Sequence, residues 1–282
     1  MDQSNREEWL KWRKIGSSDA PVILGVSPWM TPYQLWEQKI SNKESSINPA
    51  MRRGIEMEEA ARRCFEDKMG VEVFAKCLEH PNINFMTATL DGIDMDHKIA
   101  VEIKCPSATS HQFVQKNGKV PDIYYPQVQH QLEVAGLDGM YYFSFDGQDG
   151  VIVEVLRDSK YLENLISEEK IFFECLQNLE SPPLTEKDYQ HMEQNQEWMK
   201  ISSRWLEVSN NLKGLEKEEE ELRSALISLS QDKNAHGAGV RLTKSIARGN
   251  VDYSKIPQLQ GIDLNKYRKS HVTKWRLSQV KG

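Results

Sequence analysis

A heptad repeat of apolar residues in the last third of this 282-residue chain constrains its fold most strongly. Side chains recur at alternating intervals of three and four residues, and one of the ten is polar: Trp198, Ile201, Trp205, Val208, Leu212, Leu215, Glu219, Leu222, Leu226 and Leu229. A seam of this kind over more than four heptads predicts a long helix that packs against a partner helix. The partner belongs either to the same chain or to another subunit, and the spacing does not distinguish the two.

Proline residues and charge mark where the predicted helix begins and ends. The sequence Ser181-Pro182-Pro183 stands before it, and proline lacks the backbone donor that a helix interior needs. A basic segment follows it from Lys233. We therefore expect three parts: a globular domain over residues 1–180, a coiled-coil-like helix over 181–232 and a basic segment over 233–282.

The net charge of −6 is unevenly distributed along the chain. Residues 233–282 hold eleven Lys and Arg but only two acids, a net charge of +9. The preceding 232 residues hold 25 basic and 40 acidic side chains, a net charge of −15. This asymmetry predicts that the basic segment contacts a polyanion.

The basic segment also carries a predicted β-hairpin. Its strands are residues 240–246 and a run that begins at Val251, with a turn at 248–250. We expect this hairpin to present three cations to DNA phosphates, namely Arg241, Lys244 and Arg248.

Composition excludes several other classes of protein. Hydrophobic residues make up 39% and charged residues 28% of the chain, as in soluble globular proteins. No apolar run approaches the roughly 20 residues that a membrane span needs, and the N-terminus is polar, so we expect the protein in the cytoplasm. The four cysteines are scattered, which argues against a disulfide framework or a structural zinc site: Cys64, Cys77, Cys105 and Cys175.

The first part of the chain alternates between helical and strand-like patterns. Two shorter helices are expected at 7–14 and 33–40. The order after them is helix, three strands, helix, two strands and helix, at residues 51–69, 71–75, 84–90, 99–104, 124–135, 140–145, 151–155 and 161–179. This order predicts a mixed α/β domain, with a sheet flanked by helices.

Two acids and a lysine lie on two neighbouring predicted strands. Asp91 ends one strand, and Glu102 and Lys104 lie two residues apart on the next, so their side chains project from the same face. A hairpin between Asp91 and Glu102 would bring the two carboxylates together. Two carboxylates suit a hard divalent cation, whose ligand shell the Ile103 carbonyl can complete. Lys104 is then placed to position or deprotonate an attacking water and to offset charge in the transition state.

Short patterns of common residues also occur by chance, and a solvated strand face would explain Glu102 and Lys104 alone. The apolar run Ile99-Ala100-Val101 directly before them favours a buried position. A buried acid and base need a reason to be there, because burying charge is costly.

Five ordered motifs between about Trp9 and Arg157 accompany this core, at residues 12–20, 54–58, 89–92, 102–104 and 124–129. In this order they resemble the PD-(D/E)xK nucleases, and more closely the phage-type recombination exonucleases of the lambda exonuclease and YqaJ group. The resemblance implies a restriction-endonuclease-like core. Leu90 departs from the pattern, since it stands where the family name has Pro, but this change removes no ligand.

The resemblance implies a role for each matching residue. Asp91 and Glu102 would bind Mg²⁺, for which Mn²⁺ can substitute, and Lys104 would be the catalytic lysine. Glu58 would be a third acid near a second metal or its waters. Two further sets would contact DNA, with Gln127 and Tyr124 at the nucleophile or scissile phosphate and Arg13 and Ser18 at a terminal 5′-phosphate. Without the resemblance, a solvated helix face explains Glu58, a surface position explains Gln127, and a cap with an ion pair explains Arg13 and Ser18. No iron–sulfur cluster is expected, because no downstream group of cysteines is present.

Together these features predict a Mg²⁺-dependent 5′→3′ exonuclease that degrades linear double-stranded DNA in a bacterial host. The resemblance further implies a ring-shaped homo-oligomer and a single-strand annealing protein as partner. Two alternatives remain. One is an endonuclease with the same core, and the other is a non-catalytic DNA-binding or scaffolding protein built around the heptad helix and the basic segment.

Overall fold

The structure is a computed structural model that describes residues 14–41, 49–247, 249, 255–259, 262 and 277–278. Its chain divides into two compact units, Met1–Tyr189 and Gln190–Gly282. Several predictions lie outside the described residues: the helix at 7–14 except for Lys14, the strand from Val251, Arg13 and Arg248.

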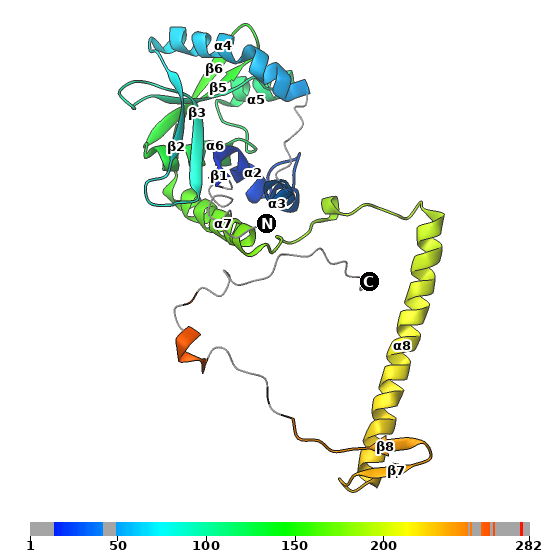
Figure 1. The fold of residues 1–282 in the computed structure, drawn as a ribbon. Helices are drawn as coiled ribbons and strands as arrows, with labels where there is room; N and C mark the ends of the chain where they lie inside the picture. The colour runs from blue at the N-terminus through cyan, green and yellow to red at the C-terminus, as the bar shows by residue number, and fades with distance from the viewer. Residues whose placement is uncertain are drawn as a thin grey trace. The chain divides into compact units, whose positions relative to one another are not determined.

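A mixed six-stranded sheet forms the centre of the first unit (Figure 1). Its strands are β1 (Ile15–Gly16), β2 (Phe74–Glu79), β3 (Met86–Ile93), β4 (Ala100–Lys104), β5 (Gly139–Phe145) and β6 (Gly150–Leu156). The order is β1-β3-β4-β5-β6, and β2 also pairs with β3. The β1–β3 and β4–β5 pairs are parallel and the others antiparallel. This confirms the predicted mixed α/β core.

Helices cover both faces of the sheet. On one face α4 (Pro49–Met69) packs Ala61 and Phe65 against Val101, Ile103 and two phenylalanines of β5. On the other face α5 (Ala108–Asn117) and α6 (Tyr125–Ala135) pack on Leu90, Ala100, Met140 and Tyr142. Alternate residues of β4 therefore face different helices, as the pleat requires. Glu102 and Lys104 fall on the α5–α6 side.

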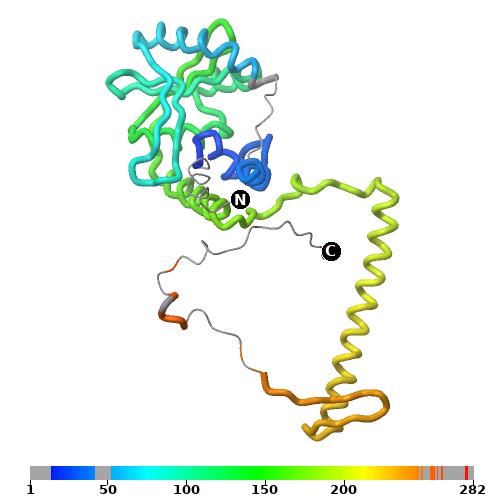
Figure 2. The backbone as a smooth tube through the Cα atoms, in the orientation of Figure 1, coloured from blue at the N-terminus to red at the C-terminus, as the bar shows by residue number. Residues whose placement is uncertain are grey.

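A second apolar cluster closes one end of the unit. Residues of η2 (Ser17–Asp19), α2 (Ala20–Ile23), α3 (Pro32–Ser41) and α7 (Ser159–Asn178) surround the start of β3. The cluster joins Ile15, Leu35, Met86 and Phe172, all of them buried. Figure 2 shows the course of the backbone through these helices and strands.

Most predicted helices and strands are present, and three predictions need correction. Helix α5 was not expected. Strand β2 begins at Phe74, whereas a strand was predicted at 71–75. In the basic segment, β8 (Val240–Leu242) pairs with β7 (Ala235–Gly237), which precedes it, so this hairpin is not the one predicted around residues 248–250.

In the described part of the second unit, one long helix is followed by that hairpin and by a short turn of 3-10 helix, η5 (Pro257–Leu259). Helix α8 (Gln196–Leu229) has 34 residues and begins at a cap in which the Asn195 side chain accepts the Trp198 N–H. Ala238 and Gly239 both have positive φ, as a two-residue hairpin turn with the right twist requires. None of the described helices is both long and apolar enough to cross a membrane.

Candidate active site

A β-bulge places Asp91 at the centre of the candidate site. Lys76 pairs with Leu90 and Phe74 with Ile93, so Asp91 and its neighbour face a single residue of β2. Such a bulge bends the strand and redirects a side chain. The Asp91 Oδ2 atom accepts the Ile103 N–H at 2.7 Å, just beyond the last β3–β4 pair.

Gly92 is required at this bulge because the next layer lies too close for any side chain. A Cβ atom there would lie 2.5 Å from Val73 Cγ2 and 2.9 Å from Val101 Cγ1. Both valines belong to the core beneath α4. In the Asp-Gly sequence, Asp91 thus contributes the carboxylate, and Gly92 allows the close packing against Val73 and Val101.

Glu102 is buried, with 2% of its surface exposed, and its carboxylate accepts hydrogen bonds from three side chains of the same chain. Its Oε1 accepts from Lys104 Nζ and from Gln127 Nε2, the latter at 2.6 Å. Its Oε2 accepts from Gln131 Nε2, which also donates to the Thr89 carbonyl. A charge this deeply buried persists only when it is paired and hydrogen bonded, so these contacts fix the carboxylate in place.

Lys104 lies at the edge of this cluster, with 26% of its side chain exposed. Its ammonium pairs with Glu102 and stands 5.5 Å from the centre of the Tyr124 ring. Burial lowers the pKa of Lys104, but the charges of Glu102 and Asp91 more than compensate, so its pKa is raised. Lys104 therefore remains a cation that can donate hydrogen bonds.

The site suits a hard cation. Burial and the charge of Glu102 raise the pKa of Asp91 to about 7. Two ionised carboxylates with one lysine are therefore unfavourable at this buried position. Two buried polar atoms beside Glu102, Gln131 Oε1 and the Tyr142 hydroxyl, have no protein partner. Since buried polar groups are normally hydrogen bonded, a hydrated divalent cation would satisfy both the charge and these atoms. Two carboxylates and a backbone carbonyl are its preferred oxygen ligands.

The structure thus brings together five predicted site residues: Asp91, Glu102, Lys104, Gln127 and Tyr124. Glu58 is exposed on α4, and its charge contributes to the raised pKa of Asp91. Among the described residues no group of three or more His, Cys, Asp and Glu gathers as a metal site. Glu58 therefore does not share one ligand cluster with the two other acids.

Three further predicted DNA contacts are among the described residues. Ser18 is exposed on η2. Arg241 and Lys244 are exposed in the second unit, where Lys244 Nζ lies 3.7 Å from Asp232.

Sequence reasoning missed one residue of the cluster, and it interpreted His130 as structural rather than as a ligand. Gln131 was not singled out, although it follows Gln127 by four residues and so shares its helix face. His130 is fully buried and bridges the Glu169 carboxylate at 2.7 Å and the Thr87 carbonyl at 2.9 Å. Burial lowers the pKa of His130, but Glu169 and the Thr87 carbonyl outweigh it, so its pKa is raised. This pair ties α6 to α7 and to β3 directly behind the site.

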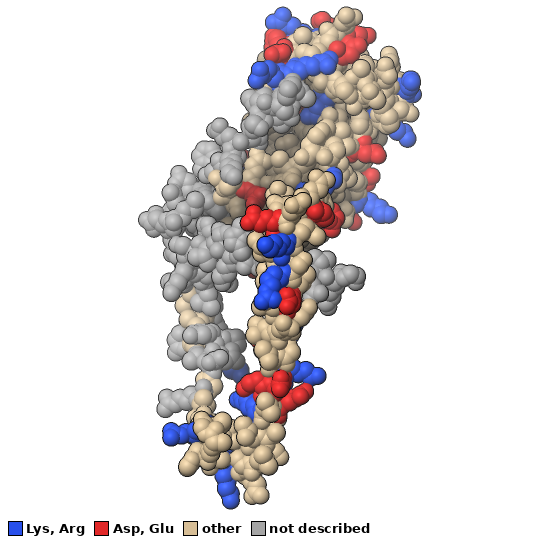
Figure 3. Space-filling model, turned by 90° about the vertical axis from the view of Figure 1, so that its right-hand side faces the viewer, with Lys and Arg blue, Asp and Glu red and all other residues tan. Residues whose placement is uncertain are grey.

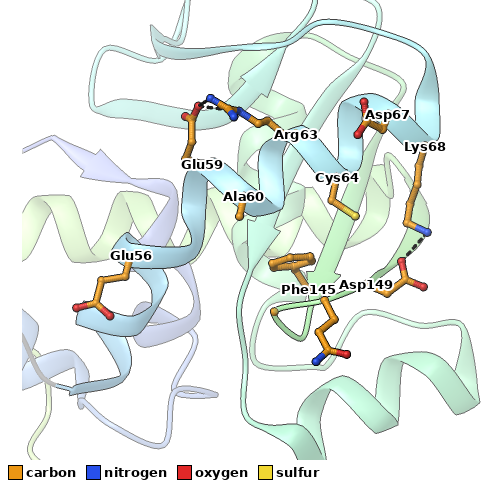
Figure 4. Close-up of a pocket in the computed structure, with 11 residues that line it drawn as sticks. Glu56, Glu59, Ala60, Arg63, Cys64, Asp67, Lys68, Phe145 and Asp149 are labelled. Carbon is orange, nitrogen blue, oxygen red and sulfur yellow. Dashed lines mark hydrogen bonds and ion pairs between the residues drawn. The ribbon is translucent and has the colours of Figure 1, made fainter.

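A separate surface depression lies between α4 and the β5–β6 turn (Figure 4). Four of its charged side chains already pair with one another, Glu59 with Arg63 and Lys68 with Asp149. None of the residues that line it belongs to the Asp91–Glu102–Lys104 cluster. On the face of the molecule drawn in Figure 3, acidic and basic side chains are interspersed. Neither feature competes with the cluster as a candidate site.

Comparisons with known proteins identify a matching family model and a relative. Residues 8–138 match the YqaJ-like viral recombinase domain. The chain is 32% identical over 180 residues to the uncharacterized protein YqaJ of Bacillus subtilis (strain 168), which covers 61% of this chain and 56% of YqaJ. It thus spans little more than half the length of that relative.

Solved structures show the same fold. The structure of LHK-Exo in complex with dAMP has a TM-score of 0.54 and 26% identity, covering 61% of this chain and 93% of that chain. A structure of the alkaline exonuclease LHK-Exo from Laribacter hongkongensis has a TM-score of 0.53 and 24% identity, covering 71% and 99%. At 24% identity, the second comparison shows a similar fold and nothing more.

Proposed function

Because residues 8–138 match the YqaJ-like viral recombinase domain and the fold is similar to that of LHK-Exo, we propose that this chain is a metal-dependent exonuclease of the phage type with a PD-(D/E)xK nuclease fold. It degrades linear double-stranded DNA from 5′ ends and leaves 3′ single strands. The observation that carries the proposal is the buried cluster of Asp91, Glu102 and Lys104, whose side chains meet at the β3 bulge. The likeness to an alkaline exonuclease supports it.

Asp91, Glu102 and the Ile103 carbonyl would hold Mg²⁺, with Mn²⁺ as a substitute. Such a cation, when bound, stabilises charge on the scissile phosphodiester and activates the water that attacks it. Glu58 is the candidate third acid, and its effect on the pKa of Asp91 is consistent with a place near the outer waters of the site.

Lys104 acts as a cation in this proposal. Its ion pair with Glu102 and its partly exposed position present the ammonium as a hydrogen-bond donor. An ammonium at the partly exposed edge of the site can orient the attacking water and offset the negative charge that develops on the phosphate. Tyr124, beneath the ammonium, limits where it can move.

Gln127 and Gln131 act through Glu102 and are therefore positioning residues. Each donates to a different oxygen of that carboxylate, so together they fix its orientation. Partners of metal-ligating carboxylates commonly affect metal affinity and activity in this way. The predicted contact between Gln127 and substrate would require this hydrogen bond to be shared or broken.

DNA contacts outside the catalytic cluster complete the proposal. Arg13 and Ser18 would hold a terminal 5′-phosphate, since charge-assisted hydrogen bonds suit a phosphate dianion. Arg241, Lys244 and Arg248 would contact backbone phosphates of the duplex. A ring-shaped homo-oligomer would keep the enzyme on its substrate, and an annealing protein would receive the 3′ single strand.

The test is digestion of matched linear and covalently closed circular duplexes in Mg²⁺. Degradation of the linear duplex alone supports the exonuclease. Nicking or linearisation of the circle would instead indicate an endonuclease with the same core. Absence of cleavage of either DNA in Mg²⁺ and in Mn²⁺ would contradict both and favour a DNA-binding protein.

A further inference from the structure

The heptad seam of α8, defined as the ten positions from Trp198 to Leu229 at spacings of three and four, has no partner among the described residues of its unit. Eight of its nine apolar side chains are between 42% and 80% exposed, and none of the residues of α8 is buried. Apolar stripes of this length mark interaction surfaces on soluble proteins. A single helix gains most of its stability from packing such a face, so the seam needs an occupant.

The partner of this seam must be a helix of similar length. A seam with a 3.5-residue period packs knobs into holes only against a second helix with the same period. At 1.5 Å per residue, the 34 residues of α8 span roughly 50 Å. Any helix that covers the seam fully therefore needs about five heptads.

This chain offers no second segment of that kind. Helices α4 and α7 have 21 and 20 residues and already pack against the sheet and the core of the first unit. The sequence after α8 is interrupted by Gly237, Gly239, Pro257 and Gly261. The segments at 1–13 and 42–48 are too short. What has the required length and period is a second copy of α8.

Charge and size decide how two copies would align. In a parallel pair, Glu219 would face the partner's Glu219 inside the seam, and like charges in that position oppose association. In an antiparallel pair with full overlap, Glu219 faces the partner's Val208. Each tryptophan then faces a leucine, with Trp198 against the partner's Leu229 and Trp205 against the partner's Leu222.

The charged residues that flank the seam do not reverse the preference for the antiparallel pair. A parallel pair gains one attraction, between Glu218 and the partner's Arg223. Arg223 already approaches Glu220 on its own helix, at 3.5 Å, and both groups are exposed. Exposed ion pairs contribute little. In the antiparallel pair, Glu216 and Glu218 lie beside the partner's Ser209 and the partner's Asn211, so no like charges meet.

We propose that two copies of this chain associate through their α8 seams as an antiparallel coiled coil. The interface is isologous, because each helix offers the same surface to the other. It is independent of the candidate active site, and it joins two nuclease units whatever assembly those units form on their own.

The test compares the mass of the full chain with that of two double variants, measured by light scattering after size exclusion. Leu215→Glu with Leu222→Glu puts two charges in the seam. Asn210→Glu with Ser224→Glu puts the same charges on the opposite, exposed face. The wild type and the control should have twice the mass of the seam variant. A ring formed by residues 1–189 would be present in all three proteins. The ratio stays at two where seams pair between rings, and the cross-links described below detect seams that pair within one ring. Equal masses for all three proteins, together with the absence of a 198–229 disulfide, would overturn the proposal.

A second variant protects the test from a helix that fails to form. Glu219→Leu removes the polar position of the seam and should lower the dissociation constant by about tenfold or more. An unchanged dissociation constant would count against the seam as the interface.

Cross-linking decides the alignment. Trp198→Cys and Leu229→Cys proteins are oxidised alone and as a mixture, with the wild type as background for the native cysteines. The antiparallel pair predicts a 198–229 disulfide only in the mixture. A 198–198 disulfide in the Trp198→Cys protein alone would overturn the antiparallel arrangement.

Discussion

The candidate site and helix α8 place their side chains in opposite ways. In the site, charged groups are buried, and Glu102 receives donors from Lys104, Gln127 and Gln131 of the same chain. On α8, large apolar side chains are exposed and lack a partner in the described part of their unit. The candidate site is thus arranged by residues of one chain, whereas the seam, in our proposal, is completed by a second copy of the chain.

Removal of the Asp91 or the Glu102 carboxylate should have the largest effect of all the changes. It tests the part of the comparison that concerns the candidate site. Asp91→Asn and Glu102→Gln each keep the shape of the side chain but remove a charge that would hold the cation. We expect the cleavage rate to fall on the order of a thousandfold or more. The measurement is the initial rate of nucleotide release from linear duplex DNA. Asp96→Asn, an exposed acid in the β3–β4 turn, is the matched control and should retain the wild-type rate.

Loss of one positioning contact should have an intermediate effect. Gln131→Leu leaves Glu102 Oε2 without its amide donor in a buried setting. We expect the concentration of Mg²⁺ that gives half-maximal rate to rise by roughly 10–100-fold, while the rate at saturating Mg²⁺ changes less. Gln148→Leu, at the exposed β5–β6 turn, should leave the curve unchanged. A purely structural role for Gln131 would instead lower thermal stability without moving the Mg²⁺ dependence.

The cost of burying Asp91 should be measurable as a pH dependence of stability in EDTA. The folded protein keeps a proton on Asp91 up to about pH 7, whereas the ordinary pKa is 3.8. Stability from this group is therefore complete below about pH 4 and is lost as the pH rises to about 7. Asp91→Asn does not titrate, so it should melt several degrees higher than the wild type at pH 8 and similarly at pH 4. Equal melting temperatures at both pH values would show that Asp91 ionises normally.

The smallest expected effect concerns the basic segment of the second unit. Charge reversal at Arg241, Lys244 and Arg248 should weaken DNA binding and flatten its salt dependence. Each lost phosphate contact reduces the log–log slope by about 0.9 on duplex DNA. The measurement is the binding constant against salt concentration, in Ca²⁺ to prevent cleavage. A slope equal to that of the wild type would assign these cations to protein contacts rather than to DNA.

The shared face of Glu102 and Lys104 could be predicted from sequence because strand periodicity alone fixes it. The bulge at Asp91 could not be predicted in this way, because it depends on the register in which β2 pairs with β3. Gln131 carried a usable signal in its four-residue spacing from Gln127. That spacing indicates a shared helix face but not the carboxylate that both amides contact.

Helix α5 shows why one element was missed. It buries only His111 and Val114, while Phe113 is exposed, so it has no continuous apolar stripe. Its end signals were present in the sequence: Ser107 caps its first turn, and Gly118 ends it in the left-handed region. The β7–β8 hairpin was misplaced for a related reason, because its turn at Ala238-Gly239 lies within a run of small residues without apolar alternation on both sides.

The most direct test of the proposed activity is end-label release by three proteins: wild type, Lys104→Ala and Lys98→Ala. Lys98 is an exposed lysine in the β3–β4 turn and is the matched control for loss of a cation. On a linear duplex labelled at one 5′ or one 3′ end, the wild type and Lys98→Ala should release the 5′ label first, in Mg²⁺. Lys104→Ala should release neither label at a measurable rate while it keeps the wild-type melting temperature within a few degrees. Release by Lys104→Ala at a near wild-type rate would contradict the assignment of the active site.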